Sequence, residues 1–423
     1  MNILQLSTDD FSGGASRAAY RLHQALCAQG LDSRMRVLVH QTANARVIAG
    51  RGPRSFEQKV RDRVARVLRD RRARQFRTDN LILHSYGQVS AGLVGEINAS
   101  PADVLNLHWI VNLLSVEDIG RLRKPIVWTL HDMWAFCGGE HYAPDNVGAR
   151  FGHGYLNDNR PAGEHGPDLN REAWERKRRA WADQSFQIVA PSRWMAGCVR
   201  DSVLFRNTPV RVIPNPIEME QLWRPLSKRF AHAALGLDPN KQYVLSGSAG
   251  GSPHLKGEDL LLKAMARVAA ARGQEIEILI FGQFRPLHDQ DWPCRVHWLG
   301  PVRDDHVMAT IYSACDLMVV PSRQDNLPNT AVEANACGAP VVGFEIGGLP
   351  DIVSHQESGW LARAFDTDML GDGILWMLSD PQRLAKLSAQ ARKIALARYS
   401  GQAVTQQYLQ VYEEARAGWR ARP

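Results

Sequence analysis

Two carboxylates in the second half of the chain carry its clearest chemistry. Asp325 and Glu333 lie eight residues apart within VVPSRQDNLPNTAVEANACGAPVV, residues 319–342. Pro328 suits the first turn of a helix between them, because its missing N–H costs nothing there. The unpaired N–H groups at a helix start favour an anion, and a phosphate held there would have a carboxylate on either side. The segment therefore suits a nucleotide diphosphate-sugar; the alternative is an acidic first turn and an ordinary exposed glutamate.

A lysine at another predicted helix start could neutralise such an anion. Lys256 ends the glycine-rich segment GSAGGSPHLK, residues 247–256, and precedes an apolar pattern of helical period. A cation is unfavourable at the N-terminal end of a helix dipole, so a bound anion would explain the position of this lysine. A flexible, solvated side chain is the alternative.

Two histidines follow predicted buried strands. His108 comes directly after residues 104–107 (VLNL), and His131 comes after residues 126–130 (IVWTL). Ligand groups in α/β folds collect at the carboxyl ends of strands. One histidine in such a place could equally be a structural group, whereas two favour a functional site. The sequence does not settle which of the two matters more.

A pair of glycines, Gly13 and Gly14, joins a predicted strand at residues 2–7 to a predicted helix at residues 15–29. A strand, a glycine-rich turn and a helix open a Rossmann-like domain. The turn reads S-G-G-A-S-R rather than G-x-G-x-x-G, so the dinucleotide fingerprint is absent and a dehydrogenase is disfavoured.

The same alternation of strand and helix predicts the elements that must position these side chains. Residues 140–170 lack periodicity and predict a long loop, and Ser192 predicts a helix N-cap. Further strands are expected at 34–40, 186–190, 210–214, 243–246, 276–281 and 296–299, and helices at 171–182, 304–314 and, without interruption, 382–420.

The composition is that of a globular protein with two domains. The chain has 423 residues, 44% of them hydrophobic and 22% charged, enough for two cores of roughly 200 residues each. We find no apolar run near the ~20 residues of a membrane span and no basic n-region of a signal peptide. The six cysteines are scattered, which favours reduced thiols and a cytoplasmic location. His141, His153 and His165 are twelve residues apart and match no compact metal-ligand pattern, so no metal is expected.

The net charge of +7 is concentrated in one segment. Residues 54–77, RSFEQKVRDRVARVLRDRRARQFR, contain ten basic and three acidic side chains, with apolar residues at helical spacing. Such a basic amphipathic helix could be solvated, could dock on an anionic membrane surface beside a lipid-linked acceptor, or could bind nucleic acid. Nucleic acid is disfavoured, because no stacking aromatics interleave with the arginines.

Several motifs resemble the retaining glycosyltransferases of family 4, of the bacterial surface-polysaccharide type. They are the D-x7-E pair with the following AVEANACGAPVVGFEIGGLPDIV (residues 331–353), LNLHW, TLHDMWAFCGGEHY and IPNP. The family has glutamate where this chain has Asp325, so the carboxylate here is one methylene shorter. The family also has an arginine shortly before the lysine, whereas this chain has Gly250 and Gly251 in that region.

The resemblance implies the GT-B fold, in which two Rossmann-like α/β domains face each other across a cleft. The domains would be residues 1–214 on the acceptor side and 215–400 for the nucleotide-sugar, with a helix at 401–423 packing back on the first. Glu333 would bind ribose, Asp325 would orient the donor sugar, and His131 and His108 would lie near that sugar. The diphosphate would contact Lys256, Gly13, Gly14 and the segment at the helix start, Asn326, Leu327, Pro328, Asn329 and Thr330, through its backbone N–H groups.

The implied activity is retaining transfer of a hexosyl unit from a nucleotide-diphosphate sugar, with UDP or GDP, to a saccharide acceptor. Exopolysaccharide, O-antigen or lipopolysaccharide synthesis would supply that acceptor, which is expected to be lipid-linked. The resemblance implies no cofactor and no metal, and the enzyme could lie peripherally on the inner face of the plasma membrane. The alternatives are a GT-B epimerase or phosphorylase, and a non-catalytic basic protein of membrane surfaces or nucleic acid.

Overall fold

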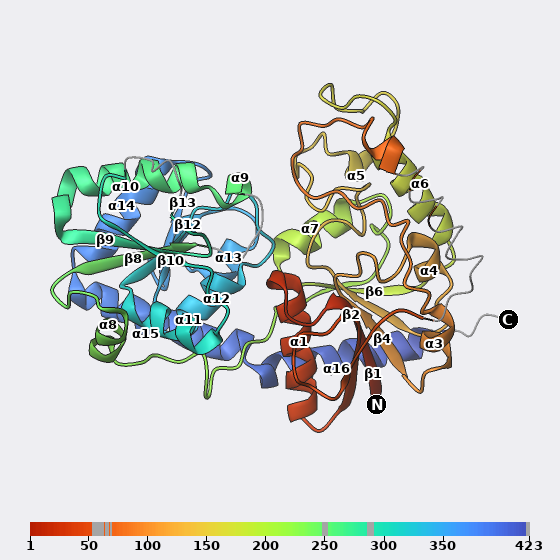
Figure 1. Ribbon diagram of the computed structural model, residues 1–423, viewed down its shortest axis with the longest axis horizontal. Coiled ribbons are helices and arrows are strands. Elements are labelled where there is room, and N and C mark those ends of the chain that lie inside the picture. Colours follow the sequence, from red (N-terminus) through yellow and green to blue (C-terminus); the bar gives the residue numbers. More distant parts are fainter. Residues whose placement is uncertain (53–62, 64–66, 68–69, 248–252, 286–291, 420–423) are drawn as a thin grey trace. The chain divides into compact units, whose positions relative to one another are not determined.

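The computed structural model describes the chain except residues 53–62, 64–66, 68–69, 248–252, 286–291 and 420–423 (Figure 1). The chain forms two compact units. The first comprises Met1–Ile213 and Thr405–Pro423, and the second comprises Pro214–Val404. Most of the basic segment 54–77, and Gly250 and Gly251, lie outside the described residues.

The first unit contains a seven-stranded parallel sheet in the order β3-β2-β1-β4-β5-β6-β7. Three of its strands, β4 to β6, are mainly apolar runs buried on both faces, as parallel sheets covered by helices require. The strands are β1 (Asn2–Asp9), β2 (Asp32–Val39), β3 (Val47–Ala49), β4 (Val104–Leu107), β5 (Ile126–Thr129), β6 (Phe186–Ala190) and β7 (Val210–Val212). The helices are α1 (Gly13–Ala28), α3 (Val94–Ala99), α4 (Val116–Gly120), α5 (Arg150–His153), α6 (Leu169–Ala180), α7 (Arg193–Asp201) and α16 (Gly401–Gly418).

The second unit repeats this topology with a six-stranded parallel sheet, β10-β9-β8-β11-β12-β13. Helices α10 and α14 cover one face of this sheet, and α11 and α12 the other (Figure 1). Alternate residues of its strands enter two cores: Val244 packs with α10 and α14, and Leu245 packs with α11 and α12. The strands are β8 (Gln242–Gly247), β9 (Ile276–Phe281), β10 (Val296–Gly300), β11 (Leu317–Val320), β12 (Val341–Phe344) and β13 (Gly359–Ala362). The helices are α8 (Lys228–Leu235), α9 (Pro253–Lys256), α10 (Glu258–Arg272), the 3-10 helix η1 (Gly273–Glu275), α11 (Asp305–Ala314), α12 (Asn329–Ala336), α13 (Leu349–Ile352), α14 (Thr367–Leu378) and α15 (Pro381–Tyr399).

In both sheets the strand order reverses beside the first strand, between β1 and β4 and between β8 and β11. A crevice forms outside the carboxyl ends of the strands at such a switch point, and ligands bind there. The candidate residues follow these four strands, and His131 follows the next one, β5. Among the described residues, no helix is both long and apolar enough to cross a bilayer.

The sequence predictions of individual elements were mostly confirmed, with one clear error. Ser192 caps α7, its side chain accepting a hydrogen bond from the Met195 amide. The uninterrupted helix predicted at 382–420 is wrong, because Ser400 is extended and separates α15 from α16. Ile217 accounts for the break: its amide donates to the Tyr399 carbonyl at 2.9 Å, which holds the chain out of helical geometry there.

Candidate functional site

The switch point of the second unit brings Lys256 and Asp325 together. Lys256 ends α9, after β8, and Asp325 lies in the loop between β11 and α12. The Lys256 ammonium (Nζ) is 2.7 Å from the Asp325 carboxylate (Oδ2); the lysine side chain is 31% exposed and the aspartate side chain 12%. The partly exposed lysine can therefore turn from the largely buried carboxylate to a ligand in solvent reach.

A cavity of about 240 Å³ opens beside this pair. It lies at the start of α12, where unpaired backbone N–H groups and the helix dipole favour negative charge. The cavity therefore combines a lysine, two carboxylates and the positive end of a helix. The lining residues are Ser246, Gly247, Lys256, Glu258, Leu261, Ile280, Phe281, Gly282, Gln283, Val320, Pro321, Ser322, Asp325, Pro328 and Thr330.

Two glycines permit the close backbone contacts that shape this site. Gly257 has φ +69°, and a Cβ there would lie 2.0 Å from the Pro321 carbonyl oxygen. Gly347 has φ +52°, and a Cβ there would lie 2.1 Å from the Asp325 carbonyl oxygen. Any larger residue would push the loop of Asp325 away, so these glycines fix the loop against its two neighbours.

Some of the residues predicted to bind the donor line the cavity, and others do not. Lys256, Asp325, Pro328 and Thr330 line the cavity, whereas Glu333 is not among the described residues that line it. Glu333 is 6% exposed and accepts a hydrogen bond from the Tyr312 hydroxyl at 3.0 Å. The side chains of Asn326 and Leu327 are buried, and Asn329 accepts from the Asn215 amide at 3.1 Å.

The sequence analysis missed an arginine that holds the segment before Lys256. The Arg323 guanidinium donates to both carboxylate oxygens of Asp259, at 2.8 and 2.6 Å, and to the His254 carbonyl at 2.8 Å. The Arg323 amide donates to the Leu255 carbonyl at 2.7 Å. Arg323 thus ties the loop after β11 to the loop after β8. A charged residue between the β11 strand and Asp325 was the signal available in the sequence.

The switch point of the first unit brings the two predicted histidines together. His108 Nδ1 is 3.0 Å from His131 Nε2, and the two rings stack. Burial lowers the pKa of His131 to about 4, although the Asp132 charge opposes this. Burial and the neighbouring His131 also hold the pKa of His108 well below its usual value. Both rings are therefore neutral near pH 7.

Gly13 and Gly14 are the first residues of α1, directly after β1. Both are exposed, and Gly13 has φ +77°. Asp9 holds the turn before them, its carboxylate accepting from the amides of Phe11 and Ser12 at 2.9 and 2.5 Å. The glycines therefore start a helix at the same sheet edge as the histidines, with an open surface.

A hydrogen-bonded series of side chains around a third histidine, His141, lies beside this pair. His141 Nδ1 lies 2.6 Å from Asp132 Oδ2, and His141 Nε2 lies 2.9 Å from Ser85 Oγ. This order of atoms matches a serine–histidine–aspartate triad. Ser85 does not line the adjacent cavity of about 10 Å³, which His141 and His131 do line, so the serine hydroxyl faces no described pocket for an acyl substrate. We interpret the series as a structural support that orients Asp132.

The loop after His131 is held by a buried lysine. Lys177, from α6, is fully buried and donates to the carbonyls of Trp134, Cys137 (3.0 Å) and Gly138 (2.7 Å). Its ammonium also lies 3.8 Å from the centroid of the Trp134 ring. Burial lowers the pKa of Lys177 to about 7. These contacts satisfy three carbonyls that would otherwise be buried without partners.

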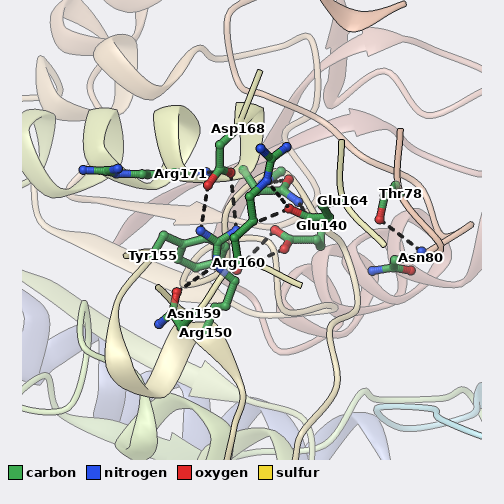
Figure 2. Close-up of polar contacts among 12 residues, drawn as sticks. Thr78, Asn80, Glu140, Arg150, Tyr155, Asn159, Arg160, Glu164, Asp168 and Arg171 are labelled. Atoms are coloured by element: carbon green, nitrogen blue, oxygen red, sulfur yellow. Dashed lines mark hydrogen bonds and ion pairs between the residues drawn. The ribbon is translucent and has the colours of Figure 1, made fainter. Parts of the chain in front are cut away.

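An arginine organises the long loop at 140–170, which contains the short helix α5. Figure 2 shows Arg150 donating to Asn159 and to Asp168, and Glu164 beside it. Its shortest carboxylate contact is 2.8 Å, to Asp168, and its guanidinium lies 4.5 Å from the Tyr155 ring centroid. The predicted loop is therefore fixed by buried charges rather than by secondary structure. Among the described residues, no group of three His, Cys, Asp or Glu side chains is arranged to hold a metal.

The neutral histidines predict a loss of stability in acid. His23, in α1, is fully buried, and burial together with the charge of Arg46 lowers its pKa to about 4. Burial lowers the pKa of His131 to about the same value. Below pH 6.5 the unfolded chain binds protons that the folded first unit does not, so stability falls from pH 6.5 to about 4. At 1.36 kcal/mol per pKa unit, each ring contributes up to roughly 3 kcal/mol.

Urea unfolding between pH 7.5 and 4.5 would measure this loss, and His23→Gln should flatten the slope. The exposed His153 provides the control, since His153→Gln should leave the slope unchanged. An identical slope for wild type and His23→Gln would contradict the assignment.

Comparisons with known proteins agree with this architecture. A family model described as "Glycosyltransferase Family 4" matches residues 12–221, and one described as "Glycosyl transferases group 1" matches residues 242–380. D-inositol 3-phosphate glycosyltransferase of Segniliparus rotundus is 31% identical over 245 residues, 56% of this chain and 54% of that protein. The Thermobispora bispora protein of the same name is 33% identical over 227 residues, which are 50% of this chain and 52% of that protein. The chain thus spans about half the length of the curated relatives it matches.

Solved structures share the fold over nearly the whole chain. Sucrose-phosphate synthase from Thermosynechococcus elongatus superposes with a TM-score of 0.66 and 18% identity, covering 99% of this chain and all of that one. The Anabaena protein HepE, in complex with UDP-glucose, gives a TM-score of 0.61 and 17% identity, covering 98% of this chain and all of that one.

Proposed function

Because the chain belongs to the family 4 glycosyltransferases and has the GT-B fold, we propose that it transfers a hexosyl unit from a nucleotide-diphosphate sugar to a saccharide acceptor. One observation carries the proposal: Lys256 and Asp325 meet at 2.7 Å beside a cavity at the start of α12. The lysine and the helix dipole would take the diphosphate, and the carboxylate would take sugar hydroxyls.

Each group then has a defined role in transfer. As the bond to the sugar breaks, negative charge grows on the leaving diphosphate, and Lys256 with the backbone N–H groups of residues 326, 327, 329 and 330 would stabilise it. This positive charge stands where other transferases use a divalent ion, so we propose that transfer needs no metal. His131 would contact the transferred sugar. The assignment of Glu333 to the ribose rests on the resemblance alone, because its carboxylate is buried against Tyr312.

The finer identity of the reaction is also proposed from resemblance. We propose retention of configuration, UDP or GDP as the carrier, and a lipid-linked acceptor of bacterial surface-polysaccharide synthesis, met at the inner face of the membrane. A solved structure of the same fold, at 14% identity and a TM-score of 0.59, is WaaG, "a glycosyltransferase involved in lipopolysaccharide biosynthesis". HepE supports UDP as the first carrier to test, since it was solved with UDP-glucose.

A thermal-shift panel tests the proposal. UDP, GDP, ADP and their common sugars would each be added at a hundred times the expected Kd, with and without EDTA. Binding at that level stabilises a protein by about 2.7 kcal/mol, which raises the Tm by several degrees. We expect one base to give this shift with or without EDTA. The absence of a shift with every nucleotide would contradict the donor site and favour a non-catalytic protein.

A further inference from the structure

A chain of buried side chains runs behind the two histidines. Gln5, in the middle of β1, is fully buried, and its amide oxygen (Oε1) lies 2.7 Å from His108 Nε2. His108 Nδ1 in turn lies 3.0 Å from His131 Nε2. The chain of hydrogen bonds therefore passes through both nitrogens of His108 and ends on one nitrogen of His131.

The position of each proton follows from this order of atoms. A neutral imidazole has one nitrogen that donates and one that accepts. The Gln5 oxygen can only accept, so His108 carries its proton on Nε2 and must accept at Nδ1. The proton between the rings therefore belongs to His131 Nε2. His131 Nδ1 is left with a lone pair, and no hydrogen-bond partner for it occurs among the described residues.

A second set of contacts is compatible with this orientation of the Gln5 amide. Its nitrogen faces the Tyr412 hydroxyl of α16 at 3.4 Å, and Asn106 donates to the same hydroxyl at 2.9 Å. Asn106 is the neighbour of Gln5 in the sheet, and its own oxygen accepts from Thr129 at 3.1 Å. Because these groups are buried, each must find its partner inside the network.

We propose that Gln5 is a positioning residue that fixes the tautomer of His131, so that Nδ1 accepts a hydrogen bond from a hydroxyl group of the substrate. Both nitrogens of His108 are used within the protein, so His131 is the member of the pair that meets the ligand. A ring nitrogen that only accepts suits a sugar hydroxyl and disfavours a phosphate oxygen, which has no proton to donate. The part that concerns the substrate rests on the proposed transferase function.

The tautomer can be observed directly. Long-range ¹H–¹⁵N spectra of the full chain, labelled with ¹⁵N-histidine, distinguish a protonated ring nitrogen from an unprotonated one. A spectrum of His131→Asn identifies the His131 signals. We expect His108 and His131 in the wild type to carry the proton on Nε2 at pH 7.5. A proton on Nδ1 of His131 would overturn the proposal, and this result needs no variant and no enzyme activity.

Substitution of Gln5 tests the cause. Gln5→Met removes the accepting oxygen at similar volume, so both tautomers of His131 should appear and kcat/KM should fall about tenfold, the worth of one hydrogen bond. Tyr412→Phe should produce a smaller shift in the same direction. Ser7→Ala is the matched control, because Ser7 lies in the same strand, is fully buried, and has a hydroxyl without a hydrogen-bond partner among the described residues. It should leave both tautomers and activity unchanged.

Two results would contradict the proposal in different ways. Unchanged tautomers in Gln5→Met would show that Gln5 does not set the proton, and unchanged kcat/KM with altered tautomers would show that the substrate does not use Nδ1. A failure of the proposed function itself has another signature, since no nucleotide would then bind while the wild-type tautomers would remain as expected.

Discussion

Replacing Lys256 with alanine is expected to lower kcat/KM for sugar transfer by about 10²–10³-fold, the usual cost of removing one preorganised group that faces developing charge. The ammonium is the described cation that lines the cavity at the start of α12, so its loss leaves the leaving diphosphate to the helix alone. The loss should be mainly in kcat, because the charge on the diphosphate grows as the bond to the sugar breaks. Steady-state kinetics with the donor found in the thermal-shift panel would measure it.

The fold should tolerate this substitution. The Lys256 side chain is 31% exposed and the start of α12 lies beside the Asp325 carboxylate, so the Tm should fall by only a few degrees. Lys228→Ala is the matched control: it removes a lysine that is also paired with an aspartate in the same unit, Asp316, which lies directly before β11 whereas the cavity residue Val320 lies at its end. Lys256→Arg should recover part of the activity. Equal kinetics for Lys256→Ala and Lys228→Ala would refute the diphosphate role.

Replacing Arg150 with methionine is expected to destabilise the first unit by about 3–5 kcal/mol, because it removes the cation nearest to the buried Glu164 and to the partly buried Asp168. Arg150 is 7% exposed and contacts Asp168 at 2.8 Å and Glu164 at 3.4 Å (Figure 2). Although burial alone would raise the pKa of Asp168, its hydrogen bonds to Arg150 hold that pKa below the usual value. For a unit of about 200 residues the expected fall in Tm is on the order of 10 °C.

Calorimetry would separate this change from the unfolding of the second unit. Arg178→Met is the control, since Arg178 is exposed in α6 and, within the part of the chain that the structure describes, forms its ion pair with Glu175 across one helical turn. It should shift the Tm by less than about 2 °C. Adding Glu164→Gln to Arg150→Met should restore part of the stability by removing one unpaired charge. If Arg150→Met lowered the Tm by no more than the control does, the network would not be what holds the loop.

The strands and the two-fold α/β pattern were predictable because their signals are local. VLNL, FQIVA and IEILIF are short apolar runs between polar turns, and they form β4, β6 and β9. The meeting of Lys256 and Asp325 was expected only through resemblance, since the two are sixty-nine residues apart. Their distance depends on β8 and β11 being neighbours in the sheet, a topological fact that neither segment contains.

The supporting residues could not be found in this way. Gln5 is one polar residue within an apolar strand, and its role depends on His108, about a hundred residues later, and on Tyr412 at the other end of the chain. Lys177 belongs to a helix that reads as basic and solvated, yet it is the most deeply buried cation of that helix. The roles of Gln5 and Lys177 both depend on burial and on partners distant in the sequence. The periodicity of the local sequence indicates neither of these.

The chain runs from the first unit into the second and then back into the first. The first unit therefore cannot be completed until the second has been synthesised. The tyrosines behind Gln5 and Thr129 come from α16, which follows the whole second unit in the chain. A ribosome adding about 5–20 residues per second needs roughly 10–40 s to make the intervening 191 residues, Pro214–Val404. During that time the nascent first unit has a sheet face without its covering helix, and its buried amides are open to water. This interval is when the protein most needs a chaperone, and the second unit can finish folding before the first.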